Sequence, residues 1–289
     1  MIATHIIGGL GNQMFQFAAG KALALRLGVD LVLDDRYWDK RRYVECGLGN
    51  FAHGARSAPR LGLPAMKYES PVTYVTRKLR GTAWTVYDND ALPYDSTFSD
   101  LGDGTWLKGY FQSERYFVDH AEDIRACFQL TRPPSNETQA VMREMDNCIP
   151  VALHIRRGDM VNNTRNFAVH GTPALEYFRK AAELVASNCK ETPTFFVFSD
   201  EPRWVIENFE LDLPVKIVSH NGVDRNFEDI FLMSRCQHNI TANSSFSWWG
   251  AWLNPNPGKV VVCPDRWFAD PKLQNNSLVP ESWTTIPSQ

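Results

Sequence analysis

Residues 154–159, which read HIRRGD, place two arginines and an aspartate at the end of an apolar run. Residues two apart on a strand share a face, so His154 and Arg156 should point the same way. In open α/β sheets ligands lie beyond the carboxyl ends of the strands, and a guanidinium there can form two parallel hydrogen bonds to a phosphate. The segment therefore predicts an anion site around Arg156 and Arg157. The alternative is that an Arg157–Asp159 ion pair only holds the turn, with His154 packed beside it.

A glycine cluster, GGLGNQ at residues 8–13, lies between an apolar strand and a helix. Glycines let the backbone approach a ligand, and a helix N-terminus offers unpaired amides and a positive dipole end to an anion. Gly9 and Gly11, followed by Asp34, partly match the dinucleotide-binding fingerprint, but Met14 occupies the third glycine position. Two interpretations stay open here: a ligand-binding turn, or a tight strand–helix connection without a ligand.

A third cluster covers residues 239–250, which read NITANSSFSWWG. Asn243 or Ser244 is expected to cap a helix, and hydroxyl groups at that helix N-terminus would form a second phosphate-binding site. Trp248 and Trp252 are four residues apart and would share one helix face. We interpret these two indoles as core residues rather than as a platform for a sugar.

Two further acidic sites, Asp200 and the Asp88–Asp90 triplet, complete the candidates. Asp200 follows an apolar run and could accept hydrogen bonds from a base or a ribose, or it could cap the next helix. Asp88 and Asp90 have the D-x-D spacing that can hold a divalent cation on a nucleotide diphosphate. Because the surrounding region has little buried-strand character, we interpret this triplet as a surface turn. No group of His, Cys or Asp residues has zinc spacing, so no metal site is expected.

Alternating strands and helices must position these clusters. Short apolar runs predict strands at residues 2–7, 29–33, 151–155, 194–198, 215–218, 238–241 and 260–263. Helical spacing from Phe15 to Leu25 predicts a helix that ends at Gly28, and residues 137–146 read as another. Residues 47–64 are expected to form a loop. The series predicts an α/β fold of two Rossmann-like domains, residues 1–145 and 146–289, that face each other across a cleft.

Composition excludes several classes of protein. Hydrophobic residues make up 44% and charged residues 22%, which is typical of a globular chain. A net charge of −3, with no basic run longer than Lys40-Arg41-Arg42, argues against nucleic acid as a partner. No segment reads as a signal peptide or a membrane span, and six scattered cysteines without a C-x-x-C pair favour free thiols. A cytoplasmic protein is therefore expected.

Three long motifs occur together and in order: GGLGNQMFQ at residues 8–16, HIRRGD at 154–159 and NSSFSWWG at 243–250. In this the chain resembles the bacterial α-1,2-fucosyltransferases of glycosyltransferase family 11, over residues 1 to about 270. Residues 40–106 carry no pattern that we recognise and are expected to shape the acceptor site.

The resemblance implies a GT-B fold and an inverting, metal-independent transfer of L-fucose from GDP-β-L-fucose to the 2-hydroxyl of a terminal β-galactoside. The implied acceptor is a galactose-terminated oligosaccharide or lipid-linked glycan, in O-antigen or other surface-polysaccharide synthesis. No cofactor is implied. The N-terminal domain would lie on the acceptor side and the C-terminal domain would bind GDP-fucose. The implied location is the cytoplasm, with the inner membrane as a peripheral site.

The resemblance also implies roles for single residues. Arg156 would bind the diphosphate and stabilise its charge, His154 would contact the nucleoside and Asp200 would read the guanine edges. The further implied substrate contacts are Gly9, Gly11, Asn12, Arg157, Asn243, Ser244, Ser245 and Phe246. For the catalytic base, Asp159 is the nearest carboxylate within a motif, and Asn12 could position the acceptor hydroxyl; the base stays open.

Two other functions remain as alternatives. A nicotinamide-dependent dehydrogenase would explain Gly9, Gly11 and Asp34, but not Met14. A non-catalytic nucleotide- or glycan-binding protein would agree with the nine tryptophans, since flat aromatic faces suit sugars. The sequence predicts no oligomeric state.

Overall fold

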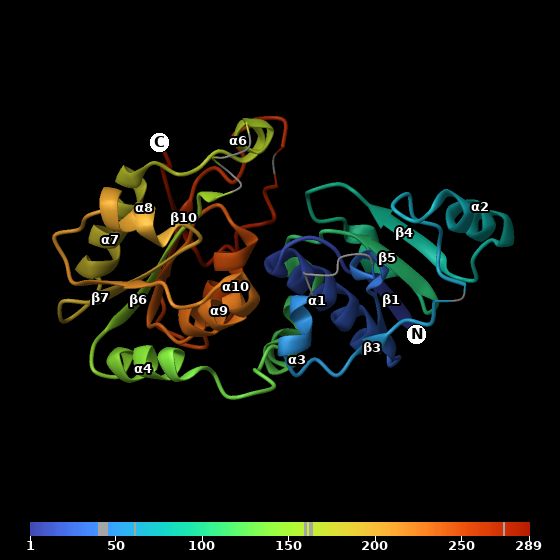
Figure 1. The fold of residues 1–289 in the computed structure, drawn as a ribbon, viewed down its shortest axis with the longest axis horizontal. Helices are drawn as coiled ribbons and strands as arrows, with labels where there is room; N and C mark the ends of the chain where they lie inside the picture. Colours follow the sequence, from blue (N-terminus) through green and yellow to red (C-terminus); the bar gives the residue numbers. More distant parts are fainter. Residues whose placement is uncertain (40–45, 61, 159–160, 162–163, 274) are drawn as a thin grey trace. The chain divides into compact units, whose positions relative to one another are not determined.

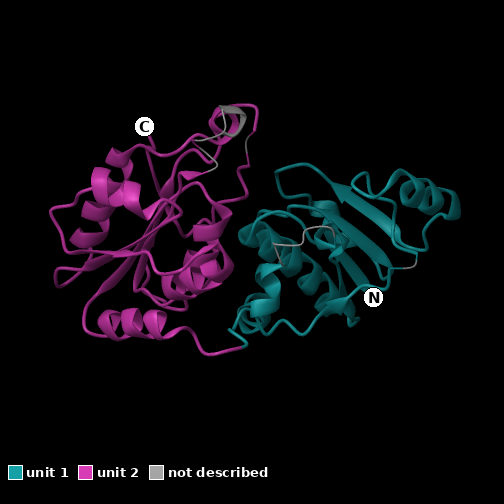
Figure 2. Cartoon of the chain, viewed as in Figure 1, with its two compact units in different colours: residues 1–131 teal, residues 132–289 magenta. Residues whose placement is uncertain are grey.

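The computed structural model divides into two compact α/β units, residues 1–131 and 132–289 (Figure 2). It describes residues 1–39, 46–60, 62–158, 161, 164–273 and 275–289. Each unit is built on a parallel sheet flanked by helices (Figure 1), so the predicted α/β class is confirmed. All six cysteines are free thiols, as expected. None of the helices in the described residues combines the length and hydrophobicity needed to span a bilayer.

Unit 1 has a five-stranded sheet in the order β3-β2-β1-β5-β4. Its strands are β1 (Ile2–His5), β2 (Leu31–Asp34), β3 (Arg56–Ser57), β4 (Thr85–Asn89) and β5 (Thr105–Gly109), and its α-helices are α1 (Leu10–Leu27), α2 (Pro71–Arg80) and α3 (Ala121–Cys127). Short 3₁₀ helices lie at Arg36–Trp38, Gly47–Asn50, Ser96–Asp100, Glu114–Tyr116 and Val118–His120.

Helix α1 packs tightly on the centre of this sheet. A Cβ atom on Gly20 would lie 2.0 Å from Oγ1 of Thr4 in β1, so only glycine permits this approach. The helix ends as predicted at Gly28, whose φ of 66° is the left-handed conformation that glycine adopts without a Cβ clash. Close helix–strand packing is the role of the third glycine of the dinucleotide fingerprint. Here Gly20 serves that purpose, while Met14 is buried.

Unit 2 has a six-stranded sheet in the order β11-β10-β9-β6-β7-β8. Its strands are β6 (Pro150–Ile155), β7 (Thr194–Ser199), β8 (Val215–Val218), β9 (His238–Ile240), β10 (Val261–Pro264) and β11 (Thr284–Ile286). Its α-helices are α4 (Asn136–Met145), α6 (Thr164–His170), α7 (Leu175–Ser187), α8 (Pro202–Asn208), α9 (Asn226–Ser234) and α10 (Ser245–Leu253), with a 3₁₀ turn at Val223–Arg225. Counted from β6, the strand order is the 3-2-1-4-5-6 arrangement of doubly wound nucleotide-binding sheets.

The two faces of this sheet have different roles. Val151, Leu153 and Ile155 of β6 pack into a core with apolar residues of α7 and α8. Since alternate side chains of a strand point to opposite faces, His154 lies on the other face, where its ring centroid is 5.5 Å from that of Phe246 in α10. This register therefore places His154 beside the first turn of α10.

The seven predicted strands and α4 are confirmed to within two residues at each end. The helix predicted from Phe15 onward ends at Gly28 as expected, but α1 begins five residues earlier, at Leu10. The predicted domain boundary near residue 145 differs from the division at 131/132. Residues before β6 are held by unit 2, because Ser135 Oγ donates to Glu228 at 2.8 Å and Thr138 Oγ1 lies 2.8 Å from Nε2 of His220. Strands β3, β4, β5 and β11 were not predicted.

Candidate functional site

In unit 2 the strand order reverses between the neighbouring strands β6 and β9. The strands that follow β6 in the chain, β7 and β8, lie on one side of it in the sheet, and β9, β10 and β11 lie on the other side. Ligands in doubly wound sheets bind beyond the carboxyl ends of the strands at such a reversal. Two of the three sequence motifs lie at the carboxyl ends of these strands: residues 154–159 begin with the last two residues of β6, and residues 243–250 follow shortly after β9. We call this cluster, together with Asp200 after β7, the β6–β9 edge.

His154 is a buried, neutral member of the β6–β9 edge. Its side chain is 3% exposed, and burial, together with the positive charge of Arg156, lowers the pKa of its imidazole to about 3. Its Nδ1 atom has no hydrogen-bond partner among the described residues. A neutral ring that packs on Phe246 and keeps one nitrogen unused fits contact with a ligand better than proton transfer near neutral pH.

Arg156 lies past the end of β6, partly exposed, and is oriented by Asp200. Its Nη1 atom lies 3.1 Å from Oδ2 of Asp200, and the backbone N–H of Arg157 donates to Oδ1 of the same carboxylate at 2.9 Å. A Cβ atom on Gly158 would lie 2.2 Å from Oδ2, so glycine at this position lets the carboxylate in. Asp200 therefore positions the turn that presents Arg156.

Arg157 makes different contacts from Arg156. Its guanidinium carbon lies 3.4 Å from the ring centroid of Trp204 in α8, and its Nε is 3.2 Å from Oε2 of Glu201. Neither partner of Arg157 was predicted from the sequence, because Glu201 and Trp204 belong to none of the three motifs. Since one face of its guanidinium covers an indole, Arg157 is the weaker of the two candidates for an anion. Asp159, the alternative partner, lies outside the described residues.

The N-terminus of α10 forms the other side of the β6–β9 edge. Ser244 caps the helix, as predicted, with Oγ accepting from the N–H of Phe246 at 3.3 Å. Nδ2 of Asn243 donates to the carbonyl of His170 at 2.9 Å and so ties the end of α6 to this edge. First-turn amides of a helix favour a negative charge. The hydroxyl side chain of Ser245 is in the first turn of the same helix.

Trp248 and Trp252 are core residues, as interpreted. Their side chains are 0% and 3% exposed, and the two rings stack with centroids 6.1 Å apart. Gly250, on the same helix, brings α10 against α9, because a Cβ there would lie 2.7 Å from Cβ of Met233. These indoles therefore support the edge and do not line it.

In unit 1 the strand order reverses between β1 and β5. Gly9 is the N-cap of α1, and nothing lies within 4 Å of the position that its Cβ would occupy. Gly11 is buried in the first turn of the same helix. Nε2 of Gln112, which follows β5, donates to Oδ1 of Asn12 at 2.8 Å and so orients that amide. Gln112 was missed by the sequence analysis because β5 was missed.

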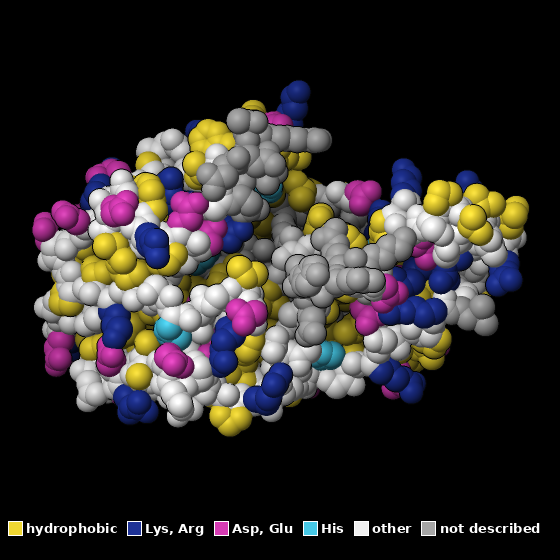
Figure 3. Space-filling view, viewed as in Figure 1, with side chains coloured by type: hydrophobic (Ala, Val, Ile, Leu, Met, Phe, Trp, Pro, Cys, Tyr) yellow, Lys and Arg dark blue, Asp and Glu magenta, His cyan; other side chains and the backbone are white. Residues whose placement is uncertain are grey.

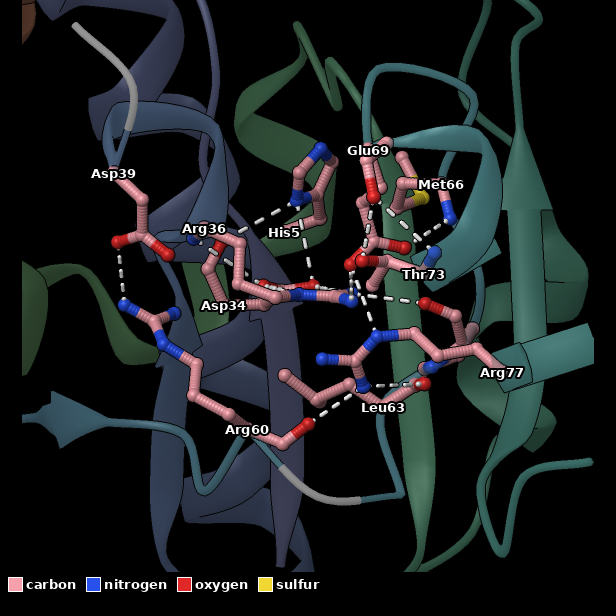
Figure 4. A network of polar contacts seen from close by, with 12 residues as sticks. His5, Asp34, Arg36, Asp39, Arg60, Leu63, Met66, Glu69, Thr73 and Arg77 are labelled. Carbon is pink, nitrogen blue, oxygen red and sulfur yellow. Dashed lines mark hydrogen bonds and ion pairs between the residues drawn. The ribbon is translucent and has the colours of Figure 1, made fainter. Parts of the chain in front are cut away.

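The carboxyl ends of β2 and β3 carry a pocket of about 420 Å³. It is lined by Arg36, Tyr37, Asp39, Arg60, Tyr68, Glu69, Ser70, Thr73 and Arg77. Figure 4 shows that Arg36 and Arg77 converge on Glu69, while Arg60 reaches Asp39. These residues lie within the part of the chain in which no sequence pattern was recognised, apart from Arg36, Tyr37 and Asp39, which directly precede it.

Asp34 holds Arg36, one of the residues that line this pocket, in place. Its carboxylate accepts from Nε and Nη2 of Arg36, both at 2.7 Å, and from Nε1 of Trp106 at 3.0 Å. Burial by itself would raise the pKa of Asp34, but hydrogen bonds from Arg36 and His5 outweigh it and hold the pKa well below its usual range. The carboxylate is 0% exposed and fully engaged, so it cannot bind a ribose as the dinucleotide fingerprint requires.

The D-x-D triplet is arranged against binding a metal ion. Nζ of Lys108 lies 2.7 Å from Oδ1 of Asp88 and 3.4 Å from Oδ1 of Asp90, so a cation already occupies the space between the carboxylates. The triplet is exposed at both acidic positions, but Asp88 and Asn89 belong to strand β4 rather than to a turn. Elsewhere in the described ranges no three His, Cys, Asp or Glu side chains gather as metal ligands would.

Comparison with known proteins gives a family. The profile of Glycosyl transferase family 11 matches residues 61–287. The chain is 30% identical over 303 residues to the O-antigen biosynthesis glycosyltransferase WbnK of Escherichia coli, covering 96% of this chain and 98% of that protein. It is 28% identical to an alpha-1,2-colitosyltransferase of Escherichia coli, covering 99% of both.

A more distant relative and a solved structure add to this. The chain is 28% identical over 259 residues to galactoside alpha-(1,2)-fucosyltransferase 1 of Leontocebus fuscicollis, covering 85% of this chain and 63% of that protein. The fold resembles the crystal structure of the fucosyltransferase NodZ from Bradyrhizobium, with a TM-score of 0.51, 15% identity, and coverage of 86% of this chain and 91% of that chain. This likeness supports the GT-B class for the two units.

Proposed function

The chain belongs to glycosyltransferase family 11, and from this premise we propose that it transfers an L-fucosyl group from GDP-β-L-fucose to the 2-hydroxyl of a terminal β-galactoside. The hydroxyl oxygen attacks C1 of fucose, the bond from C1 to the β-phosphate oxygen breaks, and GDP leaves with the electron pair. The proton of the hydroxyl is released to a general base and from there to solvent. The configuration at C1 inverts. The relatives named for α-1,2-fucosyl and α-1,2-colitosyl transfer support the linkage and the class of sugar.

The observation that carries the proposal is the position of Arg156 at the β6–β9 edge, opposite the N-terminus of α10. A departing diphosphate gains negative charge, and a preorganised guanidinium together with helix amides stabilises that charge, with each donor worth about 3 kcal/mol of barrier. Asp200 fixes Arg156 before the substrate arrives. The reaction then needs no metal ion, and the D-x-D triplet paired with Lys108 is not required for it.

The nucleoside half of the donor would lie against His154 and Phe246. The imidazole of His154 is uncharged and has one nitrogen without a partner among the described residues, so it can hydrogen-bond to a base or a ribose. Because the ring is neutral, ligand binding does not bury a charge there. Asn243, Ser244 and Ser245 would line the same region through the first turn of α10. Guanine recognition by Asp200 stays a prediction, since one of its oxygens already pairs with Arg156.

The pocket of unit 1 is the candidate site for the acceptor sugar. Its volume of about 420 Å³ lies within the range of small-molecule sites. Three arginines and two acidic residues line the pocket and provide hydrogen-bond donors and acceptors with little net charge. Tyr37 and Tyr68 add flat aromatic faces. This lining fits a neutral sugar with several hydroxyls. Gly9, Gly11 and Asn12 would approach the sugar-phosphate from the β1–α1 turn.

The structure favours this function over the dehydrogenase alternative. A dehydrogenase would need Asp34 to accept the ribose hydroxyls, and that carboxylate is buried under Arg36 and Trp106. We place the enzyme in the cytoplasm, where a lipid-linked glycan of the inner membrane would present the acceptor. The relative that is named for O-antigen biosynthesis supports this setting.

The test is product formation from GDP-fucose and lactose with excess EDTA, followed by mass spectrometry and by NMR for the linkage. A parallel reaction with GDP-colitose tests the sugar that the colitosyltransferase relative suggests. Fucosylated lactose from the wild type, and about 10²- to 10³-fold slower formation by Arg156→Ala, is the expected result. If GDP raises the melting temperature but no acceptor yields product, the protein binds nucleotide without catalysis and the proposal is wrong.

A further inference from the structure

Helix α2 has two faces with different surroundings. Its residues Thr73 and Arg77, with the N-cap Ser70, line the pocket of unit 1, and Nε of Arg77 lies 2.9 Å from Glu69. Val72, Val75 and Leu79 lie on the opposite face, within about 60° of one another on the helical circumference. One face of the helix therefore lines the pocket, and the other packs against none of the residues of unit 1 that the structure describes.

The outer face of α2 carries large apolar side chains that are exposed to solvent. Val72, Val75 and Leu79 are 77%, 52% and 83% exposed. Figure 3 shows hydrophobic side chains gathered over α2, with Lys and Arg side chains around them. Contiguous apolar surface of this kind on a folded unit marks an interaction site, whereas single exposed apolar residues need no explanation. We call Val72, Val75 and Leu79 the α2 stripe.

Basic residues flank the α2 stripe. Residues 67–80 contain four Lys or Arg and one Glu, a local charge of +3 in a chain whose net charge is −3. Glu69 is taken up by Arg36 and Arg77 on the inner side. Lys78 and Arg80 are exposed and lie about 100° to either side of the stripe, and exposed Lys67 precedes the helix. No acidic side chain of α2 opposes them.

We propose that α2 docks on the surface of an anionic lipid bilayer, with the α2 stripe in the interface and Lys67, Lys78 and Arg80 on the headgroups. An apolar face bordered by basic residues is the pattern of helices that lie in the plane of a membrane interface. Each basic residue near an anionic surface strengthens binding about fivefold. A helix of ten residues with three apolar side chains gives reversible attachment, not insertion.

The same helix joins this surface to the pocket. Because Thr73 and Arg77 line the pocket while Val72 and Leu79 face outward, docking brings the pocket to within one helix diameter of the headgroups, about 10 Å. An acceptor glycan carried on a lipid would then be presented beside it. This last step rests on the proposed function, whereas the docking itself does not.

Vesicle flotation of the full chain tests the docking. Phosphatidylcholine vesicles with and without phosphatidylglycerol are compared for the wild type, for V72Q/L79Q and for K78Q/R80Q. We expect the wild type to float only with the anionic vesicles, and high salt to reduce binding. V72Q/L79Q should bind about tenfold more weakly, and K78Q/R80Q weaker by about fivefold for each charge. The matched control I206Q/V223Q removes two exposed apolar residues of unit 2 and should float as the wild type does.

Three outcomes would overturn the proposal. The first is equal binding to both kinds of vesicle, and the second is an equal loss in the I206Q/V223Q control. The third is a wild-type dimer, seen by sedimentation, that V72Q/L79Q dissociates, because the stripe would then be covered by a second copy of the chain. Transfer to lactose, measured on the same variants, should be unchanged. If the wild type transfers nothing yet floats, the proposed function fails and the docking stands.

Discussion

Nη1 of Arg156 lies 3.1 Å from Oδ2 of Asp200, and this ion pair joins the carboxyl ends of β6 and β7, which are neighbours in the sheet. The pair leaves Arg156 partly exposed, with 30% of its side chain accessible. A charged group that is held in place but still open to solvent is suited to receive an anion, because little reorganisation is needed when the ligand binds.

The first prediction concerns Arg156 itself. Arg156→Ala should lower kcat/KM for transfer from GDP-fucose by about 10²- to 10³-fold, since one preorganised donor to the leaving group is lost. Arg156→Lys keeps the charge but not the two-pronged geometry and should recover only part of the rate. Steady-state kinetics and circular dichroism measure the two effects. The matched control is Arg179→Ala on α7, a half-exposed arginine that contacts Glu176 at 3.8 Å and the carbonyl of Glu210 at 3.4 Å, away from the β6–β9 edge. Equal losses in both variants would contradict the assignment.

The second prediction concerns the glycine beneath Asp200. Gly158→Ala would place a Cβ 2.2 Å from Oδ2, so the carboxylate must move away and Arg156 loses its support. Because the displaced atom is the end of a side chain, the unit should still fold. We expect GDP to bind about tenfold more weakly, an effect of about 1.4 kcal/mol, as measured by calorimetry. Gly258→Ala, whose Cβ would lie 3.6 Å from its nearest neighbour, should bind GDP as the wild type does.

The third prediction concerns the packing of α1 on β1. Alanine normally stabilises a helix interior over glycine by about 0.5–1 kcal/mol. At Gly20 the sign should reverse, because the new Cβ would lie 2.0 Å from Thr4 Oγ1 and 3.0 Å from Leu31 Cδ1, and overpacking costs about 1–3 kcal/mol. Thermal unfolding should show a melting temperature several degrees lower for Gly20→Ala. Gly49→Ala, with open space around its Cβ, provides the comparison, and an unchanged Gly20→Ala would refute the packing argument.

The fourth prediction is a pH dependence of stability that arises from Asp229. Burial raises the pKa of this carboxyl to about 7, although Oδ1 accepts a hydrogen bond from Nδ2 of Asn221 at 2.8 Å. Between the ordinary Asp pKa of about 4 and this value the folded state binds more protons than the unfolded state, so stability falls as pH rises.

Asp229→Asn removes that titration and keeps the acceptor for Asn221. The variant should therefore melt higher than the wild type at pH 8, by about 3 °C for each kcal/mol regained, and show a smaller difference at pH 5. Differential scanning calorimetry at the two pH values measures this. A difference that grows as pH falls would show that the sign is wrong. Asp224→Asn, at an exposed position two residues before α9, serves as the control.

The fifth prediction is that the transfer needs no metal ion. Arg156 and the N-terminus of α10 supply the positive charge at the leaving group, so the initial rate should be unchanged by excess EDTA. The measurement is the rate of fucosylated lactose formation with and without chelator. A rate that falls with EDTA and returns with Mg²⁺ or Mn²⁺ would contradict it, and Asp88→Asn would then show whether the D-x-D triplet is involved.

Much of unit 2 could be predicted from the sequence alone. Strands buried on both faces, such as Pro150–Ile155 and Thr194–Ser199, read as continuous apolar runs and need no tertiary information. The cap at Ser244 and the helix end at Gly28 are local features of hydrogen bonding and backbone conformation. The three motifs indicated the family for the same reason, since each lies within a few consecutive residues.

The strands of unit 1 that follow β2 were not predicted, and the reason is physical. Strand β4 is an edge strand whose side chains are mostly exposed, so Thr85–Asn89 shows no buried pattern. Strand β5 is buried only over Thr105–Leu107, and its last two residues, Lys108 and Gly109, interrupt the apolar run. The pocket was missed with them, because its lining combines residues from Arg36 to Arg77 that carry no shared motif.

The sequence by itself determined which residue types follow which strands: an arginine pair after β6, an aspartate after β7, and serines at the start of α10. Only the tertiary structure decided how these residues pair. Arg156 and Asp200 are 44 positions apart, and they meet because β6 and β7 are adjacent and parallel, so that their carboxyl ends lie at one edge. Likewise, the spacing of Asp34 from the glycine cluster is that of a ribose-binding carboxylate. In the structure this carboxylate is instead buried, because Arg36 and Trp106 both donate hydrogen bonds to it. Local patterns specify elements, whereas the order of strands in a sheet, which no local pattern contains, specifies partners.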